Sequence, residues 1–251
     1  MLVALLSAPG AAAQQPKADG ETRFENGLSH LREGRVEMAI EELKAAVKAD
    51  PKSPYFQKGL GVAWGRMADR CRDAKCRESA LKEAVEAARK AVSLNPYYID
   101  ARNDLGTALL RQGKREEGRK ELLAAFNDPT NPVPALTARN LGQSYLEDRN
   151  FGDALNWFQT SIGRDKSYSD AWLGVADALS AQGRVDEAIR QLESALRTLP
   201  EDVAMLGALG EAYYRAGRFD EARPRLQTVA AKDPSGVAGR RAVELLKNFP
   251  Q

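Results

Sequence analysis

Cys71 and Cys76 are the residues of this chain best suited to covalent chemistry, and they are its only cysteines. Four residues separate them, so the spacing is not the C-x-x-C of redox-active pairs. A two-cysteine zinc site would need two further ligands, and the neighbouring sequence offers no suitable pair. In an exported protein, two such cysteines typically form a small disulfide. We therefore predict a Cys71–Cys76 disulfide that pins a local loop.

The rest of the sequence offers little for catalysis. His30 is the single histidine, which excludes most histidine-based catalysis and any histidine-rich metal site. We find no phosphate-binding loop, no nucleophile paired with a base and no carboxylate pair with a defined partner. With 37 Lys and Arg against 35 Asp and Glu, the net charge of +2 gives no reason to expect nucleic acid as a partner. We predict a protein that is no enzyme, uses no cofactor or metal, and works by binding protein.

Small residues recur along the chain at a nearly constant period. One series has spacings of 34, 45, 36, 34 and 34 residues, and it consists of Gly27, Gly61, Gly106, Gly142, Ala176 and Gly210. A second series follows it with spacings of 45, 34, 36, 34 and 34 residues, and it consists of Ala39, Ala84, Gly118, Ala154, Ala188 and Ala222. Each lies in a stretch whose apolar residues have helical spacing, so we predict a tandem array of helix–turn–helix units.

These units resemble the tetratricopeptide repeat (TPR). The resemblance is carried by Leu60-Gly61 with Trp64, Leu105-Gly106, Leu141-Gly142 with Tyr145, Trp172 through Ala176, and Leu209-Gly210 with Tyr213. Glycine between the two helices of a unit can take positive φ, and an acidic residue before the second helix can cap it. The resemblance implies an all-α, right-handed solenoid of six TPR units at residues 20–53, 54–98, 99–134, 135–168, 169–202 and 203–236.

Two irregularities interrupt the period. The second unit has 45 residues in place of 34, and the extra 11 surround the two cysteines, so we expect a loop between its helices. The join of the third and fourth units contains Pro129, Pro132 and Pro134, and we expect a stiff extended segment there.

The two ends of the chain lie outside the repeats. The apolar residues 2–6, followed by small residues, read as a signal peptide over residues 1–13 that is cleaved after Ala13. The alternative is an apolar tail of a cytosolic protein. We expect residues 14–19 to be a flexible tail and residues 237–251 to be a helix that caps the open end of the solenoid.

The first helices of stacked TPR units line a concave surface. The side chains that we expect on it are Phe24, Leu28, Leu31, Tyr55, Lys58, Val62, Asn103 and Arg139. The amino-terminal part of this set is apolar, which suits an amphipathic helix or an extended apolar peptide as partner. The alternative is that Phe24, Leu28 and Leu31 belong to the ordinary core.

The join of the third and fourth units carries a narrower resemblance. The stretch from Phe126-Asn127-Asp128-Pro129 through Asn140-Leu141-Gly142 to Ala154-Leu155-Asn156-Trp157-Phe158 resembles the TPR pilotins of type IV pili, the PilF, PilW and Tgl kind. This resemblance implies a periplasmic protein at the inner face of the outer membrane that binds protomers of the PilQ-type secretin and promotes their insertion and multimerisation. That family is usually lipidated, and no lipid-acceptor cysteine is present in this sequence. The alternative is a general exported TPR scaffold for envelope or peptidoglycan assembly.

Overall fold

The computed structural model describes the backbone of residues 11–249 and the side chains from Ala18 onward. Within residues 11–249 it contains thirteen α-helices and no β-strand. In chain order the helices are α1 (Ala11–Arg32), α2 (Val36–Ala49), α3 (Pro54–Arg70), α4 (Ala74–Leu94), α5 (Ile99–Arg111), α6 (Arg115–Phe126), α7 (Pro134–Glu147), α8 (Phe151–Arg164), α9 (Ser169–Ala181), α10 (Val185–Thr198), α11 (Val203–Arg215), α12 (Phe219–Lys232) and α13 (Val237–Lys247).

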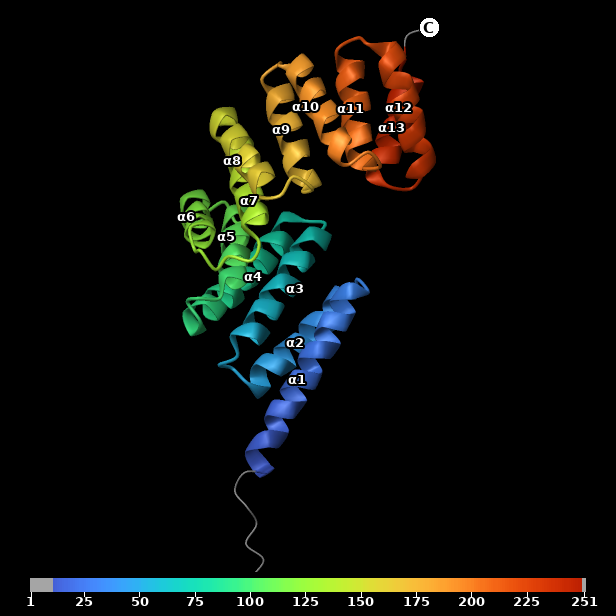
Figure 1. Ribbon diagram of the computed structural model, residues 1–251. Helices are drawn as coiled ribbons and strands as arrows, with labels where there is room; N and C mark the ends of the chain where they lie inside the picture. Colours follow the sequence, from blue (N-terminus) through green and yellow to red (C-terminus); the bar gives the residue numbers. More distant parts are fainter. Residues whose placement is uncertain (1–10, 250–251) are drawn as a thin grey trace, which may run out of the picture. The chain divides into compact units, whose positions relative to one another are not determined.

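The helices fall into two compact units, Met1–Pro132 and Val133–Gln251. The first unit holds the pairs α1–α2, α3–α4 and α5–α6, and the second holds three further pairs and α13 (Figure 1). Within each unit the two helices of a pair pack together, and the first helix of each pair also contacts the first helix of the next. This arrangement confirms the predicted all-α array of helix–turn–helix repeats.

The turns inside the pairs show why glycine recurs there. Gly34, Gly113, Gly183 and Gly217 have φ between 72° and 86°, where a residue with a side chain is strained. In the α7–α8 turn a non-glycine residue, Arg149, takes this conformation with φ of 58°. These turns are the glycine stops that the sequence predicts.

Asp73 caps α4 as expected, but the capping of four other second helices differs from our expectation. The residues that precede α2, α6, α10 and α12 are Arg or Lys, and none of them makes a side-chain capping hydrogen bond. The acidic residues lie in the first turn instead, where the positive end of the helix dipole favours them. Two of these glutamates also form ion pairs with the residue that precedes the helix. The N–O distances are 2.6 Å for Arg184–Glu187 and 2.8 Å for Arg218–Glu221.

The small residues allow the two helices of a pair to approach closely. A Cβ added at Gly118 on α6 would lie 2.8 Å from the backbone oxygen of Gly106 on α5 and equally close to Leu110. Glycine replaces the usual alanine here because the backbone of α5 and the Leu110 side chain leave no room for a methyl group.

The eleven inserted residues form helix and not a loop, which corrects our expectation. In five pairs the first helix ends five residues after its small residue of the first series. Helix α3 instead continues for nine residues beyond its small residue, Gly61. Likewise α4 begins ten residues before Ala84, its small residue of the second series. The other second helices begin only three residues before the corresponding small residue. The insertion therefore adds four residues to α3 and seven to α4, and only residues 71–73 remain as a turn.

The two termini also differ in part from expectation. Helix α1 begins at Ala11, so residues 14–19 are helical and not a flexible tail. Residues 1–10 of the predicted signal peptide lie outside the described residues, and Ala13 lies in the first turn of α1. At the other end, α13 packs on α11 and α12 and buries Ala242 and Leu245 in the position expected for the capping helix.

The proline-rich join contains a turn and not an extended segment. The backbone N–H of Asn131 donates to the carbonyl oxygen of Asp128 at 3.0 Å, and the Asp128 side chain accepts from the N–H of Thr130 at 2.8 Å. Asp128 thus uses its short polar side chain to close the turn around Pro129. Pro134 is the first residue of α7, where its missing N–H costs no helical hydrogen bond.

Candidate protein-binding surface

In the first unit, α1, α3 and α5 are the first helices of their pairs and contact one another in sequence. Two predicted groove residues on α3, Tyr55 and Lys58, lie together at this surface. Tyr55 is 57% exposed, and its ring centroid lies 5.1 Å from that of Tyr98, which directly precedes α5. The Lys58 Nζ lies 5.9 Å from the Tyr98 ring centroid. Tyr55 is exposed and Tyr98 is half-buried, and such an aromatic pair beside a cation is a typical anchoring surface for a protein partner.

Asp104 on α5 completes this group. Its Oδ2 atom lies 3.8 Å from the Lys58 Nζ, and this buried oxygen has no hydrogen-bond partner among the described residues. Burial disfavours the ionised carboxylate and raises the pKa of Asp104 to about 6, although Lys58 acts in the opposite direction. Burial, and next the charge of Asp100, also raises the pKa of Tyr98 to about 12. We call Tyr55, Lys58, Tyr98 and Asp104 the tyrosine–lysine patch.

The predicted apolar end of the groove is mostly core. Leu31 is only 4% exposed, and Phe24, Leu28 and Val62 are half-buried against the same cluster of apolar side chains. The Phe24 ring packs on Phe56 with 5.0 Å between the ring centroids. Leu31 is therefore not available to a partner, while Phe24, Leu28 and Val62 present only part of their surface.

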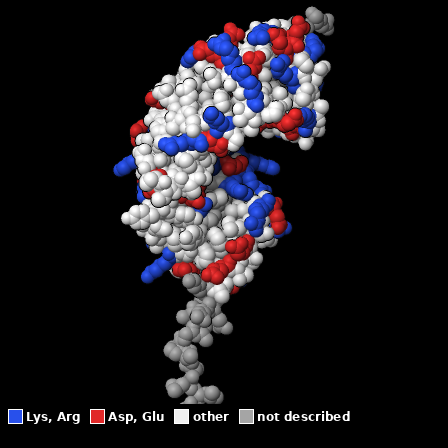
Figure 2. Space-filling view, in the orientation of Figure 1, with Lys and Arg blue, Asp and Glu red and all other residues white. Residues whose placement is uncertain are grey.

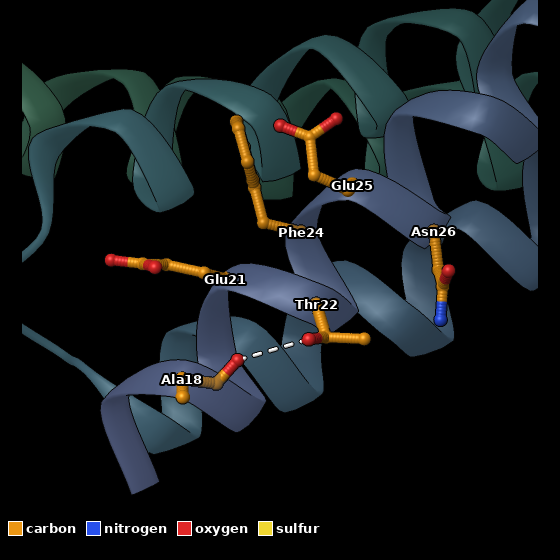
Figure 3. Close-up of a pocket in the computed structure, with 6 residues that line it drawn as sticks. All are labelled: Ala18, Glu21, Thr22, Phe24, Glu25 and Asn26. Atoms are coloured by element: carbon orange, nitrogen blue, oxygen red, sulfur yellow. Dashed lines mark hydrogen bonds between the residues drawn. The ribbon is translucent and has the colours of Figure 1, made fainter. Parts of the chain in front are cut away.

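An open pocket borders Phe24 on α1 (Figure 3). Its volume is about 610 Å³, and its lining residues are Ala18, Glu21, Thr22, Phe24, Glu25 and Asn26. In the close-up, Phe24 and Glu25 point to the same side of α1 and Asn26 points to the other. Among the described residues the lining consists mainly of polar side chains of one helix, and Phe24 is its one large apolar side chain.

The two remaining predicted groove residues, Asn103 and Arg139, do not join this surface. Asn103 on α5 is 5% exposed and cannot serve as a contact residue. Arg139 lies on α7 in the second unit, where its Nη2 is 3.6 Å from Asp170 Oδ2 of α9. Of the predicted set, Tyr55 and Lys58 are thus the side chains of the first unit that the fold presents together.

The second unit carries ion pairs on the corresponding helices. Glu211 on α11 accepts hydrogen bonds from Arg215 at 2.8 Å and from Arg241 of α13 at 3.0 Å. Burial would raise the pKa of Glu211, but these hydrogen bonds outweigh it and hold the pKa below its usual range. A small cavity of about 80 Å³ lies beside this group, and Asp177 and Ser180 of α9 line it. This surface is charged and largely self-paired, in contrast to the tyrosine–lysine patch.

The sequence reasoning missed Tyr98 and Asp104. Tyr98 precedes its helix and Asp104 follows the position that we expected to face the groove, so helical periodicity alone selects neither residue. The tyrosine pair at residues 97 and 98, beside a proline, was the available signal for Tyr98.

Metal sites and membrane spans are not found in the described part of the chain. Among these residues no group of His, Cys, Asp or Glu is placed to hold a metal ion. In the same part of the chain no helix is both long and apolar enough to cross a bilayer. Cys71 and Cys76 form a disulfide, with their Cα atoms 5.6 Å apart.

Comparison with known proteins places the repeats in a family. Two models of the tetratricopeptide repeat match the chain, one at residues 24–69 and 139–203 and the other at residues 181–246. Together they cover more than half of the sequence.

Two individual proteins with similar sequences indicate more specific relationships than the repeat family does. The type IV pilus assembly protein PilF of Pseudomonas aeruginosa is 28% identical over 153 residues, which is 61% of this chain and 56% of PilF. Cellulose synthase operon protein C of Escherichia coli K12 is 30% identical over 156 residues, 60% of this chain but only 14% of that protein. The chain thus matches about half of the length of PilF and a small part of the longer relative.

Solved structures show the same fold. The structure of PilF from Pseudomonas aeruginosa has a TM-score of 0.66 at 20% identity and covers 92% of this chain and 99% of its own. The structure of PilW, a type IV pilus biogenesis factor, has a TM-score of 0.67 at 19% identity and covers 89% and 98%. These two relatives are named as pilus factors and not as enzymes, which supports the prediction that this protein is no enzyme. The chain is a tetratricopeptide repeat protein related to the PilF and PilW type IV pilus assembly factors.

Proposed function

We propose that this protein is a binding factor for type IV pilus biogenesis that holds secretin protomers and promotes their multimerisation in the outer membrane. The observation that carries the proposal is the relation to PilF, which extends over 61% of the chain, together with a fold match over 92% of it. The proposal places the protein in the periplasm, at the inner face of the outer membrane.

The tyrosine–lysine patch supports a role in binding protein. Tyrosine offers a large contact area at a low entropy cost, and the exposed Tyr55 lies beside the partly exposed Lys58. Burying apolar area contributes about 25 cal/mol per Å², so a modest contact holds a partner reversibly after ordering costs. In this mechanism the protein shields an apolar secretin segment until the protomers assemble.

The proposal predicts direct binding of the purified secretin protomer. We expect Tyr55→Ala combined with Lys58→Ala to weaken binding by about tenfold, or about 1.4 kcal/mol, because tyrosine is enriched among the few interface residues whose truncation costs most. Tyr97→Ala is the matched control, since Tyr97 is 84% exposed and makes no ring contact with the patch among the described residues. Isothermal titration calorimetry measures both affinities. Equal affinities for the wild type and the double variant would exclude the patch as the binding site.

A general envelope scaffold is the second candidate. The match to a cellulose synthase operon protein favours it, because that relative is named for cellulose synthesis and not for a pilus. Co-purification of other envelope proteins without secretin would support this candidate over the first.

A further inference from the structure

The extension of α3 and α4 forms a helical arm, which we define as residues 67–80. It contains the four residues added to the end of α3, the turn at residues 71–73 and the seven added to the start of α4. At a rise of about 1.5 Å per residue, the two helices project roughly 6 and 10 Å beyond the ends of their neighbours. Within residues 11–249, none of the other five helix pairs has such an extension.

The arm has its own small core. Ala68, Cys71, Ala80 and Leu81 are buried together, and Trp64, Met67 and Cys76 pack against them. The Cys71–Cys76 disulfide joins the two helices across the turn, and the Asp73 side chain caps α4 by accepting from the N–H of Cys76 at 2.8 Å. The arm is therefore an ordered projection whose surface side chains stand on fixed helices.

Arginine side chains tie the arm to the turns on either side. Arg66 and Arg70 donate to the carbonyl oxygens of Leu31 and Gly34 at the end of α1, both at 2.6 Å. On the other side, Arg111 of α5 donates to the carbonyl oxygen of Gly65 at 3.3 Å and pairs with Asp69. The turns of the first three helix pairs thus lie side by side along one edge of the first unit.

Most of the carboxylates on this edge are already neutralised. Glu33 pairs with Arg35, Glu37 with Arg70 and Asp69 with Arg111. Asp73 is occupied in capping α4, which leaves Glu78 as the carboxylate of the arm without a partner among the described residues.

Five cations on the same edge remain available. They are exposed and make no ion pair within the described part of the chain, and they are Arg32, Arg72, Lys75, Arg77 and Lys114. We call these five side chains the basic edge. Lys and Arg side chains gather where α1 and α3 end in the space-filling view (Figure 2).

We propose that the basic edge is a docking surface for an acidic segment of a partner protein. Unneutralised cations on an ordered support attract and orient an anionic chain, and the attraction weakens as salt screens it. A membrane surface fits less well, because amphipathic elements that bind lipid add the insertion of exposed apolar side chains to the attraction of their cations. Met67 of the arm and the nearby Trp64 are instead packed against its core. The basic edge is separate from the tyrosine–lysine patch. The proposal for it does not depend on the identity of the protein that binds the patch.

The test compares two charge-reversal variants with equal changes in net charge. The arm variant is Arg72→Glu with Lys75→Glu and Arg77→Glu. The control is Lys48→Glu with Lys90→Glu and Lys120→Glu, which reverses exposed lysines on the second helices of the same unit. Fluorescence anisotropy measures binding of a short labelled peptide of alternating glutamate and serine, with a glutamine–serine peptide as the neutral probe. Circular dichroism establishes that each variant is folded.

We expect the wild type to bind the glutamate peptide, to prefer it to the neutral peptide and to lose affinity as salt rises. We expect the arm variant to bind at least about tenfold more weakly and the control within about twofold of the wild type. The neutral version, Arg72→Gln with Lys75→Gln and Arg77→Gln, should lie between the wild type and the arm variant. Equal binding by the arm variant and the wild type would overturn the proposal. Binding of phosphatidylglycerol vesicles but not of the glutamate peptide would also overturn it, in favour of a lipid surface.

Discussion

Burial of Asp104 between α3 and α5 raises its pKa from 3.8 to about 6, so ionisation of this carboxyl group opposes folding. Between these two values the folded state binds more protons than the unfolded state. The free energy of unfolding therefore falls as pH rises from about 4 to 6, and the loss is complete above that window. The buried Oδ2 atom without a hydrogen-bond partner is the structural origin of this effect.

We predict that Asp104→Asn removes this pH dependence and stabilises the protein at pH 7. The side chain is 34% exposed, so solvent screening reduces the gain to about 1 kcal/mol. Urea unfolding at pH 4 and pH 7 measures it, with Glu86→Gln on the exposed side of α4 as the control. A variant that is less stable than the wild type at pH 7 would mean that the carboxylate stabilises the fold.

Arg149 holds a backbone conformation that glycine holds in four other turns. A side chain at positive φ costs about 1 kcal/mol. We predict that Arg149→Gly raises the free energy of unfolding by about 0.5–1 kcal/mol. Arg149→Ala keeps the strain and should show no such gain, so an equal effect of the two changes in thermal unfolding would contradict this explanation.

At the scale of elements, the close approach of α5 and α6 depends on Gly118. We predict that Gly118→Ala destabilises the first unit by about 1–3 kcal/mol, because the added methyl group meets the backbone of Gly106 and the side chain of Leu110. The matched control is Gly163→Ala on α8, where an added Cβ has no neighbour within 4 Å. That change should be neutral or slightly stabilising, by about 0.5 kcal/mol, because alanine is the better helix former. Chemical denaturation of both variants separates packing from helix propensity.

The Cys71–Cys76 disulfide stabilises one helix pair, because it closes the end of α3 and α4. A cross-link between residues five apart contributes about 2 kcal/mol in the chain-entropy account. We predict that Cys71→Ser with Cys76→Ser speeds amide hydrogen exchange in residues 67–80 and leaves α11 and α12 unchanged. Unchanged exchange in the arm would show that its small core suffices without the cross-link.

The elements also show how far sequence reasoning extends. Periodicity predicted the helix pairs, the glycine stops and the capping helix, because each follows from local spacing and turn chemistry. It placed the insertion in a loop, whereas residues 67–80 have helical propensity and a small apolar core that extend α3 and α4. It likewise expected Leu31 and Asn103 to face a partner, but their burial depends on contacts between helices that a single helical face does not reveal. The Lys58–Asp104 pair joins residues 46 positions apart and depends on the packing of α3 on α5.

At the scale of the whole molecule, the array of helix pairs suits binding and not catalysis. The two surfaces identified in the first unit have different chemistry, since the tyrosine–lysine patch is aromatic and the basic edge is cationic. A partner that needs both would be held by an apolar contact and steered by charge. The relation to PilF makes a pilus component the partner that we propose.

The most direct test of this account is the assembly state of the secretin in cells that lack the gene. We predict that deletion strongly reduces the heat-resistant secretin multimers in the outer membrane, and that the wild-type gene restores them. The Tyr55→Ala and Lys58→Ala double variant should restore them poorly at equal protein level, while Tyr97→Ala should restore them fully. Unchanged multimers in the deletion strain would contradict the proposed function.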